Sequence, residues 1–131
     1  MKLSTSKLKK IPIYIFLLLL LKNVEAQQWI PLGETESSIT YVDAGSIKKN
    51  GNYRRAWLLQ DRNTPQEGVL SFRALSEYDC QNERLRDISL TSHSKNMAAG
   101  DVSTLRSEPG PWKYPAPGTV LESIFKYVCK K

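Results

Sequence analysis

The sequence predicts an α+β domain in which an antiparallel twisted sheet of about five to six strands carries a C-terminal helix, packed on one face and disulfide-tethered. Three features predict this class. Apolar and polar residues alternate over residues 69–80, as in an antiparallel strand with one buried face. A capped amphipathic segment follows Thr119. Two cysteines, Cys80 and Cys129, stand at the ends of these two segments.

Residues 1–26 have the organisation of a secretory signal peptide. Four lysines precede an apolar run of eleven residues, 11–21, and the segment ends in Ala26. A membrane-spanning helix needs roughly 20 apolar residues, so this run is too short to span. We expect cleavage after Ala26, with a shifted cut or an uncleaved N-terminal anchor as alternatives. Lipid anchoring is not expected, because neither cysteine lies at the cleavage point.

The charge of residues 27–131 argues against a general polyanion binder. The whole chain holds nineteen Lys and Arg against thirteen Asp and Glu, a net charge of +6. Residues 1–26 hold five of these basic residues and one acidic residue, so the mature segment has fourteen and twelve, a net charge of +2. A nucleic-acid-binding domain shows a clustered basic excess, so we expect no nucleic-acid partner. About 105 residues make one domain.

Turn and strand signals divide the mature segment into short strands. Pro31 restricts this segment to an edge strand or to a strand end, because proline lacks the N–H that a central strand donates. Asn50-Gly51 is a tight-turn pair before a strand whose Trp57 and Leu59 we expect to contact the core. The candidate strands are residues 29–32, 38–43, 53–60, 69–80, 83–92 and 102–105.

Two strands have patterns that make specific predictions. One side of the strand at 69–80 holds Leu70, Phe72, Ala74, Ser76, Tyr78 and Cys80, and the other holds Ser71, Arg73, Leu75, Glu77 and Asp79. In the strand at 83–92, Leu85 and Ile88 differ in parity, which predicts a β-bulge if both are buried.

The C-terminal helix is predicted from its cap and its apolar stripe. Thr119 occupies the N-cap position, and Glu122 three residues later completes a capping box. The stripe consists of Val120, Leu121, Ile124, Phe125 and Val128. Two cysteines in a small exported chain most simply pair with each other. A bond between Cys80 and Cys129 would join the apolar surfaces of strand and helix at their rim.

The order of motifs along the mature chain resembles the surface-adhesin protein E family. The motifs are Tyr41-Val42-Asp43, Ser46-Ile47, Gly51, Trp57, Leu59, Ser71, Tyr78-Asp79-Cys80, Arg84, Arg86, Gly100, Trp112, Pro117-Gly118-Thr119 and Tyr127-Val128-Cys129. The resemblance implies an antiparallel sheet with a C-terminal helix tethered by a disulfide. It also implies relatives that include a lipid-anchored adhesin for host proteins such as vitronectin, laminin and plasminogen. This chain lacks the lipid-acceptor cysteine of that adhesin.

Residues suited to catalysis or metal binding are sparse. His93, the only histidine, lies in a polar run and is expected at the surface or in a turn. One histidine and two paired cysteines do not supply a zinc site, and no calcium-loop pattern is present. Glu77 and Asp79 share a strand face that we expect to be solvated, although Asp79 has an alternative, structural role before Cys80. We expect no catalytic residue, no metal and no cofactor.

Arginines on three successive strands form the main candidate site. Arg73, Arg84 and Arg86 are the proposed protein-binding patch, with Arg54 and Arg55 on the preceding strand. The acidic neighbours Glu77, Asp79, Glu83 and Asp87 offer the alternative that the arginines are neutralised in cross-strand pairs. The tryptophans Trp29, Trp57 and Trp112 are either structural or part of an aromatic binding surface.

These features favour a non-catalytic binding protein of the bacterial cell envelope, either periplasmic or secreted. Its expected partner is a protein, either a host extracellular-matrix or serum protein or an envelope protein, bound through the sheet face and loops. Two alternatives remain open at this stage: a small periplasmic enzyme with an unlocated carboxylate pair, and an envelope structural or stress factor without a discrete ligand.

Overall fold

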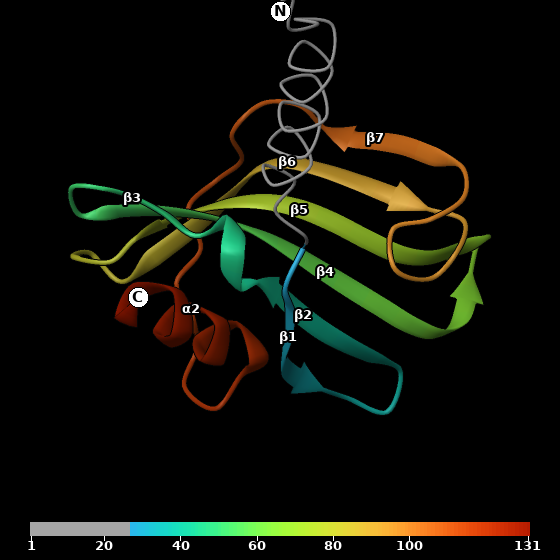
Figure 1. Ribbon diagram of the computed structural model, residues 1–131, viewed down its shortest axis with the longest axis horizontal. Coiled ribbons are helices and arrows are strands. Elements are labelled where there is room, and N and C mark those ends of the chain that lie inside the picture. Colours follow the sequence, from blue (N-terminus) through green and yellow to red (C-terminus); the bar gives the residue numbers. More distant parts are fainter. Residues whose placement is uncertain (1–26) are drawn as a thin grey trace, which may run out of the picture.

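A computed structural model describes residues 27–131 of the chain (Figure 1). The signal peptide expected at residues 1–26 lies outside the described residues. The elements are β1 (Trp29–Glu34), β2 (Ser38–Asp43), the 3-10 helix η2 (Ala44–Ser46), β3 (Lys48–Asn50), β4 (Tyr53–Gln66), β5 (Val69–Asp79), β6 (Arg84–His93), β7 (Val102–Arg106) and α2 (Val120–Lys130). Within residues 27–131, no helix is long and apolar enough to cross a membrane.

The strands form one open antiparallel sheet in the order β1-β2-β4-β5-β6-β7, and β3 pairs with the first residues of β4. Figure 1 shows α2 against one face of this sheet, toward the β1 and β2 side. The predicted fold class is confirmed. The short β3, which the sequence did not predict, brings the sheet to seven strands.

Pro31 and Gly51 suit the places that they occupy, in an edge strand and in a tight turn. Pro31 lies in β1, which is an edge strand, so its missing N–H leaves no ladder bond unmade. In the β3–β4 hairpin Asn50 pairs with Tyr53, and Gly51 has a φ of 60°, a conformation that glycine adopts without strain. The predicted tight turn at Asn50-Gly51 is therefore confirmed.

The predicted irregularity in β6 is also present. Leu75 of β5 pairs with Ser89, whereas the next residue, Ser76, pairs with Asp87. Ile88 is therefore the extra residue of a β-bulge, which explains why Leu85 and Ile88 differ in parity.

The core lies between α2 and one face of the sheet. Its buried apolar side chains are Val42, Ala56, Tyr78, Leu85, Ile124 and Val128. β4 contributes Ala56 and Leu58 to this face, so the expectation that Trp57 contacts the core was wrong, whereas Leu59 is buried as expected. Leu59 is fully buried, but on the opposite face, next to Tyr41 and Arg73 in register. β4 is apolar on both sides at this point, so alternation alone did not identify the core side.

α2 begins as predicted. The Thr119 hydroxyl accepts a hydrogen bond from the Glu122 N–H at 3.2 Å. The Glu122 carboxylate accepts one from the Gly118 N–H at 3.4 Å and pairs with Lys126 at 3.3 Å, and these contacts lower the pKa of Glu122. The first turn of the helix then meets β1, where a Cβ at Gly33 would overlap the Val120 side chain. Glycine at this position allows the close approach of helix and strand.

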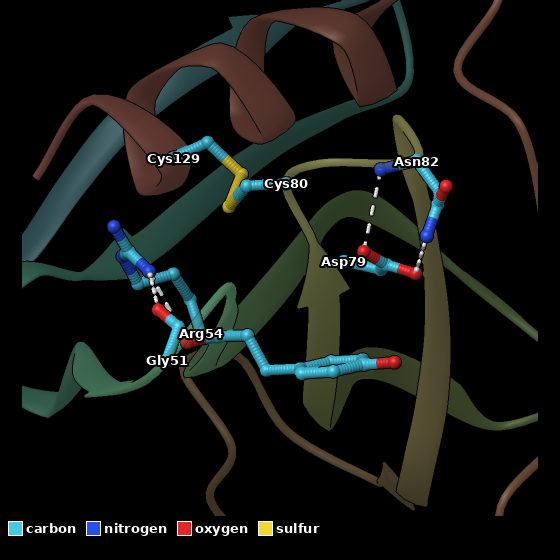
Figure 2. The surroundings of a disulfide bond; sticks show 7 residues. Gly51, Arg54, Asp79, Cys80, Asn82 and Cys129 are labelled. Carbon is cyan, nitrogen blue, oxygen red and sulfur yellow. Dashed lines mark hydrogen bonds between the residues drawn. A yellow bond between two sulfur atoms is a disulfide. The ribbon is translucent and has the colours of Figure 1, made fainter.

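The disulfide fastens the other end of α2. Figure 2 shows the bond between Cys129 in the last turn of the helix and Cys80, directly after β5. Their Cα atoms are 5.6 Å apart, within the usual range for a disulfide. The helix is therefore held by its capped start against β1 and by a covalent bond at its end, which confirms the predicted tether.

His93 is not at the surface, as expected from its polar neighbours, but is 5% exposed as the last residue of β6. It pairs in register with Ser71 of β5 and Val102 of β7, and its Nε2 lies 2.8 Å from the Thr91 hydroxyl. Burial, with a smaller effect from the Arg73 charge, lowers the pKa of His93. The polar residues next to His93 in the sequence did not indicate that β6 extends to His93 between β5 and β7.

Removing the crosslink tests its contribution to stability. The disulfide joins residues 49 apart in sequence, and the loop-entropy relation predicts a contribution of about 4 kcal/mol from such a loop. We expect the double variant Cys80→Ser, Cys129→Ser to lose roughly that amount in urea unfolding at neutral pH. A loss below about 1 kcal/mol would contradict a helix that depends on its tether.

The buried histidine predicts an acid-sensitive stability. Because the folded-state pKa of His93 lies below the unfolded value of about 6.5, the unfolded chain binds more protons between these two values. The free energy of unfolding should therefore fall as pH drops below about 6.5. The variant His93→Gln should lack this part of the pH dependence when urea midpoints are compared across that range. Parallel curves for the two proteins would show that His93 does not titrate on unfolding.

Candidate functional site

The sheet face opposite α2, here called the helix-free face, collects the charged residues singled out from the sequence. Since side chains alternate along a strand, Arg55 of β4, Arg73 of β5, and Arg84 and Arg86 of β6 all lie on this face. Arg54 lies on the other face. It is 8% exposed and donates hydrogen bonds to the carbonyls of Gly51 and Tyr53, the first of which is drawn in Figure 2.

Each arginine of the proposed patch lies over a tryptophan ring. The guanidinium carbon of Arg73 is 4.3 Å from the ring centroid of Trp57. Those of Arg84 and Arg86 are each 4.3 Å from the centroid of Trp112. Such cation–π contacts restrict flexible arginine side chains and place charge and aromatic surface side by side. The third tryptophan, Trp29, lies at the start of β1, and no arginine or lysine of residues 27–131 stacks on its ring.

Trp112 reaches this face through a pairing that the sequence did not predict. The segment after β7 pairs with β6, where Leu85 N–H donates to the Lys113 carbonyl at 2.9 Å and Lys113 N–H to the Leu85 carbonyl at 2.7 Å. Leu85 points into the core, so the neighbouring Trp112 is directed to the side of Arg84 and Arg86. The chain between residues 107 and 118 carries no strand pattern, so only the three-dimensional structure reveals this contact.

The arginines are partly neutralised, as the alternative of cross-strand pairs with acidic neighbours expected. Glu77 accepts hydrogen bonds from Arg86 at 2.8 and 3.0 Å and from Arg55 at 3.3 Å. Arg84 pairs with Asp79 at 2.9 Å. Arg73 makes no ion pair within residues 27–131.

The other two acidic candidates do not join these pairs. Asp87 lies on the helix side, where it pairs with Lys113 at 3.1 Å and accepts a hydrogen bond from the Ser76 hydroxyl at 2.8 Å. Glu83 is exposed in the turn between β5 and β6 and forms no ion pair within the described residues.

The expectation that Glu77 and Asp79 are solvated was wrong, because the arginines cover them. Asp79 is 1% exposed and accepts hydrogen bonds from the side chain and backbone of Asn82 and from Arg84. The bonds from Asn82, with those from Arg84, lower the pKa of Asp79. Asp79 therefore holds the turn that follows Cys80 (Figure 2) and remains ionised, which is unsuited to a general acid.

Two hollows lie on the helix-free face, and Lys48 and Arg55 line both. One, of about 370 Å³, is further lined by Asp43, Gly45, Ser46, Trp57 and Leu75. The other, of about 390 Å³, is further lined by Asn50, Tyr53, Arg54, Glu77 and Arg86. Among residues 27–131, no group of three His, Cys, Asp or Glu residues is placed to hold a metal ion.

Asp79 predicts a second pH effect, confined to more acidic solution. Its pKa is lower in the folded state than the unfolded value of about 3.9, so its stabilisation is full above that value and is lost as pH falls through the folded pKa. We expect Asp79→Asn to destabilise the protein by about 1–3 kcal/mol at neutral pH. The difference from wild type should shrink below about pH 3.9 in urea titrations. A difference that does not change with pH would mean that the Asp79 charge contributes nothing to folding.

Comparisons with known proteins agree with this geometry. A family model described as surface-adhesin protein E matches residues 29–130. The solved structure of Haemophilus influenzae protein E is 15% identical, with a TM-score of 0.60 over 82% of this chain and 87% of that one. A second crystal form of that protein is 14% identical, with a TM-score of 0.58 over 81% and 97% of the two chains.

The structure of protein E from non-typeable Haemophilus influenzae is also 14% identical, with a TM-score of 0.53 over 80% and 86% of the two chains. A search of curated proteins found no match. At such identities the solved structures establish a common fold, whereas the family model spans nearly all of residues 27–131. The chain therefore belongs to the surface-adhesin protein E family.

Proposed function

We propose that the protein is an exported binding protein that recognises another protein through its helix-free face, with Arg73, Arg84 and Arg86 as the principal contacts. The observation that carries this function is the stacking of these arginines on Trp57 and Trp112. Arginine and tryptophan are the residue types most enriched where interfaces concentrate their binding energy.

The stacking also lowers the entropic cost of binding. A free arginine side chain loses rotamer freedom when a partner immobilises it, at a cost of about 0.5–1.5 kcal/mol. Arg84 and Arg86 are already held between a tryptophan and a buried carboxylate, so part of that ordering precedes binding. The family description, surface adhesin, supports a partner outside the cytoplasm. That partner is a host extracellular-matrix or serum protein, or an envelope protein.

Export completes the proposal. Residues 1–26 act as the signal, cleavage follows Ala26, and residues 27–131 function as one domain in the periplasm or after release. A disulfide in the mature domain suits such a compartment, because cytoplasmic thiols are kept reduced. Mass spectrometry of the protein from fractionated cells should find Gln27 at the N-terminus and no free thiol.

Binding is tested with the oxidised domain of residues 27–131 immobilised on a sensor surface. Purified vitronectin, laminin and plasminogen, together with fractionated envelope proteins, serve as analytes. Replacing Arg73, Arg84 and Arg86 together by Gln should weaken binding of a recognised protein at least about tenfold, since interface arginines of this kind contribute about 1–2 kcal/mol each.

A folding control is needed because Arg84 and Arg86 neutralise buried carboxylates. Arg73→Gln removes the arginine that has no ion pair within the described residues, so it should weaken binding without lowering the unfolding midpoint. Arg62→Gln, on the opposite face of β4, is the matched charge control. Unchanged affinity of both patch variants, with both folded, would reject the helix-free face as the binding surface.

A further inference from the structure

The β3–β4 hairpin places like charges directly opposite each other. Lys48 pairs in register with Arg55, and Lys49 with Arg54. Like charges at directly opposed positions destabilise a sheet, whereas opposite charges at the same positions stabilise it. Arg54 relieves its pair by turning its guanidinium to the carbonyls of Gly51 and Tyr53. In the pair of Lys48 and Arg55 on the helix-free face, both side chains are exposed. Arg55 contacts Glu77 at 3.3 Å, whereas Lys48 forms no ion pair within residues 27–131.

These two residues begin a row of charges that runs across four strands. In register across β3, β4, β5 and β6, the row is Lys48, Arg55, Glu77 and Arg86. Glu77, its one carboxylate, makes two hydrogen bonds of 3.0 Å or less to Arg86 and a single 3.3 Å contact to Arg55. The row therefore carries three cations against one anion.

Lys48 and Arg55 have unused N–H donors that face the solvent. The Arg55 side chain is 58% exposed and uses one of its five N–H groups on Glu77. Lys48 forms no ion pair within residues 27–131, so its ammonium donors are available. Both side chains line the two hollows described above, one of which presents Trp57 and Leu75 and the other Tyr53.

We propose that Lys48 and Arg55 bind carboxylates of an extended acidic peptide, whose intervening side chains occupy the hollows on either side. An incoming carboxylate supplies the anion that the row lacks and accepts hydrogen bonds from both cations. The unfavourable pairing of Lys48 with Arg55 is then relieved in the complex. This site deepens the proposed function and rests on it, because it lies on the same face as Arg73, Arg84 and Arg86.

Three observations favour a short acidic peptide over other anions. The mature segment has a net charge of only +2, too low for tight binding of a long polyanion. Asp43 and Glu77 each lie in one of the hollows and would repel a phosphate dianion more strongly than a carboxylate. The tryptophan rings nearby are stacked under arginines, so they are poor platforms for a sugar ring.

The test uses the oxidised domain of residues 27–131 and a fluorescein-labelled peptide of alternating glutamate and valine, with its glutamine counterpart as the control ligand. Fluorescence anisotropy at low salt should show binding of the glutamate peptide and at least about tenfold weaker binding of the glutamine peptide. A sulfated oligosaccharide competes as a separate arm. Binding of the oligosaccharide without the glutamate peptide would overturn the assignment.

Lys48→Glu separates this binding role from a structural one. It replaces a like-charge pair with an opposite-charge pair, so the unfolding midpoint should rise or stay unchanged while peptide affinity falls at least about tenfold. Lys95→Glu makes the same charge change in the loop between β6 and β7, at the opposite end of the sheet (Figure 1), and should leave peptide affinity unchanged.

If Lys48→Glu and Lys95→Glu weaken peptide binding equally, the loss reflects the net charge of the domain alone, and the site is rejected. The peptide assay is separate from the protein-binding assay, in which Arg73→Gln is tested on the immobilised domain, so the two proposals can fail separately. If the peptide does not bind while whole proteins still bind through the arginines, the acidic-peptide site alone is rejected. If protein binding does not depend on those arginines but peptide binding depends on Lys48, the proposed function fails and the anion site stands.

Discussion

The attachment of α2 to one face of the sheet is the constraint on which the rest of the structure depends. The disulfide fastens the last turn of the helix, and the close approach at Gly33 seats its first turn. Between them Ile124 and Val128 bury against Ala56, Tyr78 and Leu85. This arrangement commits one side of each strand to the core. Arg55, Arg73, Glu77, Asp79, Arg84 and Arg86 are left together on the other side.

The charged side chains of the helix-free face therefore pair with one another on that face. Two carboxylates, Glu77 and Asp79, are buried beneath the side chains of Arg55, Arg84 and Arg86. The Trp112 ring completes this layer by lying under the guanidinium groups of Arg84 and Arg86. The two carboxylates of this face therefore belong to an ordered network. The cations without an ion pair within the described residues include Lys48 of the β3–β4 hairpin and Arg73 of β5. The like-charge pair of Lys48 and Arg55 destabilises this hairpin locally. Proteins retain such local destabilisation at functional sites.

The sequence predicted the elements that depend on local patterns. Alternation in β5 assigned its two faces, the parity of Leu85 and Ile88 revealed the bulge, and Thr119 with Glu122 marked the start of the helix. It did not predict features that depend on distant pairings. Trp112 reaches Arg84 and Arg86 only because Lys113 pairs with Leu85, and the burial of Glu77 follows from arginines on two neighbouring strands. Alternation did not show which face of β4 the helix covers, because Ala56 and Leu58 lie on one face and the buried Leu59 on the other.

The central claim is that ligands bind the helix-free face and leave the helix-covered face undisturbed. Side-chain NMR of the oxidised domain, titrated with a bound protein or peptide, measures this directly. The account predicts shifts in the indole N–H signals of Trp57 and Trp112 and in the Nε–H signal of Arg73, with the methyl signals of Ile124 and Val128 unchanged. Shifts confined to those methyl groups, with silent indoles, would contradict it.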